Sequence, residues 1–91
     1  MSQFGPEAAQ AAQLRLRRIE GQIRGLQRML GEERDCTEIA QQIAAARAAL
    51  DRVAVDLLSA GLERCLREEL AGRPNGRSTL LKLQRTFLML R

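Results

Sequence analysis

The stretch that decides the fold runs from Arg34 to Arg73 and reads RDCTEIAQQIAAARAALDRVAVDLLSAGLERCLREELAGR. From Asp35 to Ala71 it contains no proline and a single glycine, and most of its residues are strong helix formers such as Ala, Leu, Glu, Gln and Arg. The stretch therefore predicts one long helix over about residues 36–71.

Both ends of this predicted helix carry recognisable signals. Asp35 and Glu38 form a capping-box pattern, in which each side chain accepts a hydrogen bond from a free backbone amide at the helix start. Gly72, followed two residues later by Pro74, is a common helix stop. These signals predict where the long helix begins and ends.

The chain's only two cysteines, Cys36 and Cys65, lie near opposite ends of the predicted helix. They are 29 positions apart, which at about 1.5 Å of rise per residue separates them by roughly 43 Å. At about 100° per residue they still point within roughly 20° of each other. Two thiols so placed cannot meet within one chain.

An apolar stripe runs beside both cysteines, with alternating steps of four and three residues. It consists of Ile39, Ile43, Ala46, Leu50, Val53, Leu57 and Ala60. If two copies pack antiparallel through this stripe about a two-fold axis, Cys36 of one chain comes near Cys65 of the other, and symmetry repeats the pair. Such a dimer would hold two identical two-sulfur sites.

Two further helices are expected, one before and one after the long helix. The first, over about residues 6–31, starts at Pro6, which suits the first turn of a helix. Its core positions recur at three- and four-residue spacing and are Leu16, Ile19, Ile23, Leu26 and Leu30. The last, over about residues 78–90, can be capped by Ser78, and its apolar face consists of Leu80, Leu83, Phe87 and Leu90. The sequence thus predicts a single all-α domain over residues 1–91, whose first two helices form an antiparallel hairpin.

The composition narrows the classes of function. Apolar residues make up 45% of the chain and aromatic residues 2%, which favours packing of helices on helices over a sheet. The formal charge of +4, nearly all from arginine, favours a polyanionic partner. Histidine is absent, which removes the usual acid–base group and the commonest metal ligand. We therefore expect neither an enzyme nor a bound cofactor.

The cellular location is predicted from what the sequence lacks. The N-terminal residues MSQFGPEAAQ have no apolar run of the kind found in signal peptides, and no segment has the apolar length of a membrane span. Two cysteines are too few for a secreted disulfide scaffold. We expect a cytoplasmic protein without membrane contact, whose thiols stay reduced unless they sense something.

Three segments carry a resemblance to a known family. The run RLRRIEGQIRGLQRML at Arg15–Leu30, then Cys36, then ALDRVA at Ala49–Ala54 resemble the copper-sensitive operon repressor (CsoR-like) family over nearly the whole chain. The resemblance implies a three-helix protomer that forms an antiparallel helical-bundle homodimer and then a dimer-of-dimers homotetramer. It also implies repression of transcription through binding to double-stranded operator DNA until an effector arrives.

The resemblance also implies which arginines contact DNA. Arg15 and Arg52 stand where the family's DNA-contacting residues do, and Arg17 and Arg18 are adjacent in the sequence. The alternative for Arg52 is an ordinary ion pair with Asp56, four residues later on the same helix.

The branch of the family is suggested by departures from its metal-sensing members. Family members that sense Cu(I) carry a histidine four residues before the second cysteine, where this chain has Gly61. Nickel and cobalt sensors rely on histidines, and formaldehyde sensors use an N-terminal proline and dispense with the second cysteine. With two cysteines and no histidine, the chain resembles the sulfurtransferase-repressor (CstR-like) branch, which responds to persulfides and polysulfides.

The hypothesis is a repressor that binds operator DNA when reduced and is released when persulfide or polysulfide bridges Cys36 to Cys65 of the partner chain. The first-turn position of Cys36 and the neighbouring charge of Arg34 favour a thiolate. Cys65, with Glu69 one turn away, would by itself be interpreted as a core residue. Two alternatives stay open: a Cu(I)-responsive repressor that holds the ion with the same two soft thiolates, and a helical interaction module without a DNA role.

Overall fold

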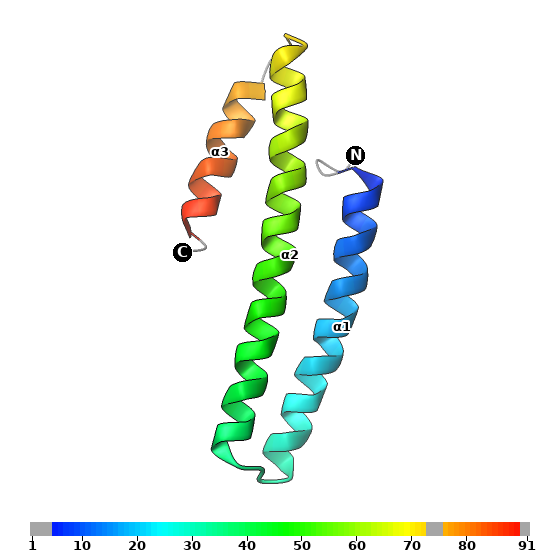
Figure 1. The fold of residues 1–91 in the computed structure, drawn as a ribbon, viewed down its shortest axis with the longest axis vertical. Helices are drawn as coiled ribbons and strands as arrows, with labels where there is room; N and C mark the ends of the chain where they lie inside the picture. Colours follow the sequence, from blue (N-terminus) through cyan, green and yellow to red (C-terminus); the bar gives the residue numbers. More distant parts are fainter. Residues whose placement is uncertain (1–4, 73–75, 90–91) are drawn as a thin grey trace.

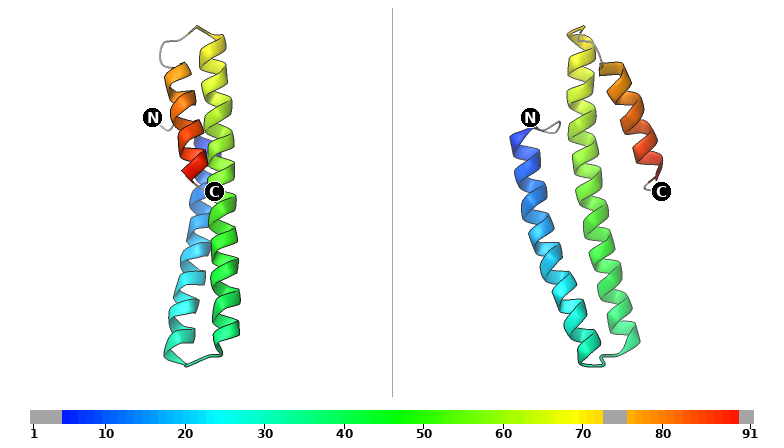
Figure 2. Two further views of the ribbon diagram at one scale, coloured as in Figure 1. Left: turned by 90° about the vertical axis from the view of Figure 1, so that its left-hand side faces the viewer. Right: turned by 180° about the vertical axis from the view of Figure 1, so that it is seen from behind.

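The computed structural model describes residues 5–72 and 76–89, and this part of the chain is entirely helical apart from short connections. The helices are α1 (Pro6–Gly31), α2 (Cys36–Leu70) and α3 (Gly76–Met89). Figures 1 and 2 show α1 and α2 as an antiparallel hairpin, with α3 folded back along the opposite side of α2. α2 therefore contacts both other helices, and the prediction of an all-α three-helix chain is confirmed.

The start of α1 follows the sequence signal. Pro6 occupies the first turn, where its missing N–H removes no helical hydrogen bond, and Glu7 lies at the positive end of the helix dipole. The preceding Gly5 has a φ of 84°, a left-handed conformation that glycine adopts without strain.

α1 ends in a backbone hydrogen-bond motif whose left-handed position is not occupied by glycine. The amide of Glu33 donates to the carbonyl of Leu30 at 3.3 Å, and the amide of Arg34 donates to the carbonyl of Met29 at 3.0 Å. This is the Schellman arrangement, whose left-handed residue is usually glycine. Here that residue is Glu33, with a φ of 54°. The turn between α1 and α2 therefore contains a strained backbone position.

The long helix α2 is unbroken from Cys36 to Leu70 and ends as predicted. Gly72 has a φ of 72°, and its amide donates to the carbonyl of Glu69 at 3.0 Å. The predicted partner in this stop signal, Pro74, lies outside the described residues.

α3 begins earlier than predicted. It starts at Gly76 rather than at Ser78, so Ser78 lies inside the first turn instead of capping the helix. Packing of an apolar face adds more helical stability than a local start signal does, and Leu80 and Leu83 line a groove against α2. The predicted last core position of this helix, Leu90, is outside the described residues.

The core of the isolated chain is small. It consists of Ala12, Ile19 and Val53, with Leu16, Ala49 and Leu57 packed against it. In the predicted stripe on α2, Ala46 and Val53 are buried, whereas Ile43 and Leu50 are 52% and 47% exposed. The chain is an elongated plate of 57 × 25 × 13 Å. Among the described residues, no helix combines the length and apolar character needed to cross a membrane.

Candidate sensor site and arginine face

Cys36 is the first residue of α2, and it is exposed. Asp35 occupies the N-cap position as predicted, but its side chain makes no capping hydrogen bond. Glu38 does not reach back to the helix start either, because its carboxylate accepts a hydrogen bond at 3.0 Å from Arg34. The predicted capping box is therefore wrong: a charge-assisted bond to a guanidinium competes successfully for the Glu38 carboxylate.

The same contacts change the electrostatics expected around Cys36. Arg34 also pairs with Glu32, at 3.4 Å, so two carboxylates surround its single charge. Its hydrogen bond to Glu38 raises the pKa of Arg34. The positive charge of Arg34 beside Cys36 is thus offset by Glu32 and Glu38.

Cys65 lies near the other end of α2 in a very different environment. It is 5% exposed, and burial raises the pKa of its thiol, with a further contribution from the negative charge of Glu68. The sequence analysis points to Glu69 as the neighbouring carboxylate, but it is Glu68 that raises the pKa of the Cys65 thiol. In the reduced single chain, Cys65 therefore resists ionisation.

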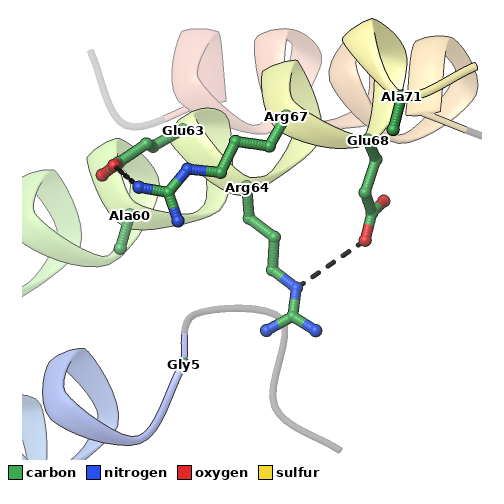
Figure 3. Close-up of a pocket in the computed structure, with 7 residues that line it drawn as sticks. All are labelled: Gly5, Ala60, Glu63, Arg64, Arg67, Glu68 and Ala71. Atoms are coloured by element: carbon green, nitrogen blue, oxygen red, sulfur yellow. Dashed lines mark hydrogen bonds and ion pairs between the residues drawn. The ribbon is translucent and has the colours of Figure 1, made fainter.

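Two arginines flank Cys65 in the sequence, and both are paired. Arg64 contacts Glu68 at 3.7 Å, and Arg67 contacts Glu63 at 2.6 Å. These two pairs line a surface pocket of about 480 Å³. Figure 3 shows Gly5, at the start of α1, on the opposite side of this pocket from the two pairs. Cys65 is not among the residues that line this pocket.

The relation between the two cysteines is as the sequence predicts. Because α2 is continuous, the rise of about 1.5 Å per residue puts Cys36 and Cys65 roughly 43 Å apart. Both are free thiols. Ile43 and Leu50, exposed and pointing in nearly the same direction, lie between them along the helix. A site that uses both sulfurs therefore has to be formed by two chains.

The residues of one chain offer little to a metal ion. In the part of the chain that the structure describes, no three His, Cys, Asp or Glu side chains gather in a group that could hold one. Gly61, at the position where the resemblance implies a third ligand in Cu(I) sensors, is a buried helical residue without a side chain.

The two arginines expected to contact DNA lie on different helices and share one carboxylate. Arg52 on α2 donates to Asp56, one turn further on, at 3.2 Å. Arg15 on α1 approaches Oδ2 of the same carboxylate at 3.8 Å, an oxygen that also accepts a hydrogen bond from Arg52 at 3.3 Å. All three side chains are between 42% and 62% exposed. Arg15, Asp56 and Arg52 thus form an ionic triad on the surface of the α1–α2 hairpin.

The other two candidate arginines differ in position. Arg18 lines a small surface hollow together with Arg15 and with Ala49 of α2, so it belongs to the same face as the triad. Arg17 is exposed, and at about 100° per residue it points about 160° away from the buried Ile19. The structure therefore brings together Arg15, Arg18 and Arg52 but leaves Arg17 on the back of α1.

Two contributions at these sites were not predicted from the sequence: the contact of Asp56 with Arg15, and the influence of Glu68 on Cys65. The i,i+4 spacing had offered Asp56 as a partner for Arg52, but its contact with Arg15 depends on the register between α1 and α2. Glu68 is three residues from Cys65, a spacing that places side chains on one helix face and that could have found it.

A family model described as metal-sensitive transcriptional repressor matches residues 8–87. The chain therefore belongs to the metal-sensitive transcriptional repressor family.

Two curated relatives match part of the chain, and both are named as copper sensors. The copper-sensing transcriptional repressor RicR of Mycobacterium tuberculosis is 44% identical over 57 residues, which cover 63% of this chain and 59% of the relative. The copper-sensing transcriptional repressor CsoR of Bacillus subtilis is 46% identical over 52 residues, which cover 57% of this chain and 52% of the relative. The chain thus spans little more than half the length of these relatives.

A solved structure matches the whole fold. The nickel-responsive transcriptional regulator InrS superimposes with a TM-score of 0.77 at 36% sequence identity, covering 100% of this chain and 98% of the other. The three-helix arrangement is thus the fold of this family.

Proposed function

We propose that this chain is a transcriptional repressor whose affinity for double-stranded DNA is controlled at a site formed by Cys36 of one subunit and Cys65 of another. The observation that carries the proposal is the unbroken α2, which keeps two thiols at its opposite ends and on nearly one side. The relatives, named as repressors and not as enzymes, support the coarse function.

Self-association supplies the geometry that the site requires. A plate whose thinnest extent is 13 Å encloses few side chains, and Ile43 and Leu50 remain about half exposed between the two thiols. Covering this strip with an antiparallel second copy buries it and brings Cys36 beside the partner's Cys65 at both ends. The resulting homodimer would pair again to form the homotetramer that the family resemblance implies.

Cu(I) is the effector that the relatives support best, because both curated relatives are named as copper-sensing repressors. Two thiolates, one from each chain, are soft sulfur ligands of the type that Cu(I) prefers. These ligands are of the type that Cu(I) prefers, but there are only two of them, because position 61 is glycine and the chain has no histidine. The names of these relatives thus favour a Cu(I)-responsive repressor over a persulfide-responsive one.

Persulfide is the second candidate effector, favoured by that same missing ligand at Gly61. The exposed Cys36 thiolate would take the outer SH group from a small persulfide RSSH, and the thiolate RS⁻ would leave. The thiolate of the partner's Cys65 would then attack the inner sulfur of this new persulfide, forming a Cys36–Cys65 disulfide and releasing HS⁻. A longer sulfur bridge forms when a polysulfide supplies additional sulfur atoms.

The proposed DNA contact is made to phosphates rather than to base edges. The exposed Arg15, Arg18 and Arg52 lie on one face of the α1–α2 hairpin, where guanidinium groups suit phosphate oxygens. Bridging the thiols at the ends of α2 would select an assembly in which these faces no longer match the duplex. A tenfold loss of DNA affinity needs only about 1.4 kcal/mol of such coupling.

The test is a DNA-binding titration of the reduced protein with the duplex upstream of its own gene, followed by addition of Cu(I) or of polysulfide. Release by Cu(I) with stoichiometric binding and no effect of polysulfide makes the protein a copper sensor. Release by polysulfide alone makes it a persulfide sensor. Cys36→Ala should abolish release by either effector while leaving the initial DNA binding intact.

Three results would contradict the proposal. DNA binding that lacks a steep dependence on salt would leave only a helical interaction module. Binding that stays unchanged in Arg15→Ala and Arg52→Ala would place the DNA contacts on other residues. Release by an effector that persists in both Cys36→Ala and Cys65→Ala would place the sensor elsewhere in the chain.

A further inference from the structure

Asp56 lies between Arg15 and Arg52, the two arginines that we propose for DNA binding, on the same face of the α1–α2 hairpin. Its carboxylate is 3.2 Å from Arg52 on its own helix and 3.8 Å from Arg15 on α1. At 46% exposure the carboxylate faces solvent, as a bound phosphate would. An acidic oxygen therefore already occupies the position between the guanidinium groups that a phosphate oxygen would otherwise take.

The charge of this triad decides how readily it attracts DNA. Two arginines and one aspartate carry a net charge of +1, whereas the arginines alone would carry +2. A phosphate that approaches either guanidinium also approaches the like charge of Asp56, which opposes binding at short range. A single phosphate contact at this face is therefore weakened by Asp56.

A purely stabilising role explains the triad less well. Ion pairs between exposed side chains contribute little to folding stability. The Arg15, Arg52 and Asp56 side chains are all substantially exposed, and the α1–α2 contact is already formed by the core around Ile19 and Val53. The cost of an acidic group on a DNA-binding face thus calls for a functional reason.

We infer that Asp56 is a specificity-determining residue, which lowers the affinity of the arginine face for DNA of arbitrary sequence. Only a duplex whose shape offers phosphates to Arg15 and Arg52 together displaces the carboxylate from both. The inference rests on the proposed function, because it requires that these two arginines contact DNA. It adds a residue that acts against non-specific binding rather than in favour of specific binding.

The experiment measures binding of the full-length reduced protein to a random-sequence duplex at several salt concentrations. Asp56→Asn removes the charge but keeps the side-chain shape and one carbonyl acceptor. We expect it to bind the random duplex about two- to fivefold more tightly, the range that corresponds to an exposed ion pair. The salt dependence should become steeper by up to about one phosphate contact, which a merely structural role would not change.

Asp51→Asn is the matched control, because Asp51 is an exposed carboxylate on the same helix and points about 140° away from Asp56. It removes the same formal charge and should leave both the affinity and the salt dependence nearly unchanged. Thermal unfolding of both variants checks that each is folded. An equal gain in the two variants would reduce the effect to net charge and would overturn the inference.

The remaining outcomes separate this inference from the proposed function. If the wild-type protein binds DNA with a steep salt dependence but Asp56→Asn binds equally or more weakly, the role of Asp56 is refuted and the repressor proposal stands. If the wild-type protein shows no salt-dependent binding to any duplex, the proposed function fails, and the role of Asp56 fails with it.

Discussion

At the scale of single residues, the two cysteines are chemically unequal, and this inequality suggests different roles. Cys36 is exposed at the positive end of a long helix, whereas Cys65 is 5% exposed and lies near Glu68. The thiol that meets an effector first should therefore be Cys36. Cys65 is suited to act second, after the partner chain has brought a reactive sulfur to it.

This inequality predicts different rates of alkylation by iodoacetamide in the reduced protein. Only the thiolate reacts, and both burial and Glu68 raise the pKa of Cys65, so its reaction should be slower than that of Cys36 and should accelerate at higher pH. Glu68→Gln removes the smaller of the two causes and should speed alkylation of Cys65. Peptide mass spectrometry over time measures both rates.

Glu69→Gln is the control for that experiment, because this exposed carboxylate is adjacent to Glu68 in the sequence and does not contribute to the pKa shift of Cys65. Its alkylation rates should match those of the wild-type protein. Equal acceleration by both variants would show that the effect of Glu68 is not local.

Glu33 gives a second prediction at this scale. Its φ of 54° is a left-handed conformation that costs a residue with a Cβ about 1–2 kcal/mol. Glu33→Gly should remove this strain, and the greater entropy of unfolded glycine offsets part of the gain, so we expect stabilisation by up to about 1 kcal/mol. Urea unfolding at fixed protein concentration measures the difference.

The same geometry at the end of α2 supplies the control. Gly72 has a φ of 72° with open space around its Cα, so Gly72→Ala should lower the free energy of unfolding by about 1 kcal/mol through backbone strain alone. If Glu33→Gly destabilises the protein while Gly72→Ala behaves as expected, the Glu33 side chain has a stabilising contact that outweighs its strain.

At the scale of elements, local signals predicted the helices well and their side-chain partners poorly. Pro6 and Gly72 act on their own backbone, so the start of α1 and the end of α2 could be read from the chain. The Glu38 carboxylate could accept a hydrogen bond either from the backbone amide at the start of α2 or from Arg34, and the sequence does not show that it accepts from Arg34. The contact of Arg15 with Asp56 could not be predicted from the sequence, because it depends on the register between α1 and α2.

The exposed strip on α2 leads to a prediction about association. Leu50 is 47% exposed, and burying a leucine side chain fully is worth about 1.5–3 kcal/mol. Leu50→Glu places a charge in the strip of each subunit and should shift the protein toward the monomer. Size-exclusion chromatography with light scattering measures the mass at several concentrations.

Leu70→Glu is the matched control for Leu50→Glu. Leu70 is 89% exposed at the end of the same helix, and at about 100° per residue it points about 160° away from Leu50. It should leave the mass unchanged. Dissociation by Leu70→Glu with no effect of Leu50→Glu would place the interface on the other side of α2.

At the scale of the whole molecule, the chain is a plate of 57 × 25 × 13 Å built on one long helix. Its small core leaves large apolar side chains exposed along α2, and the same helix holds both thiols too far apart to react within one chain. The sequence predicted this arrangement because the helix has no break and the spacing of its residues fixes both distance and direction. The identity of the effector was beyond it, because two thiols suit Cu(I) and sulfane sulfur alike.

The most direct measurement is peptide mapping of bridged protein assembled from equal amounts of ¹⁵N-labelled and unlabelled chains. After the chains are mixed under reducing conditions and treated with polysulfide, non-reducing mass spectrometry identifies the linked Cys36 and Cys65 peptides. Bridging between subunits predicts linked pairs that combine a labelled with an unlabelled peptide, alongside pairs of uniform label. Linked peptides that always carry the same label would mean that the two thiols meet within one chain, and the proposed site would be wrong.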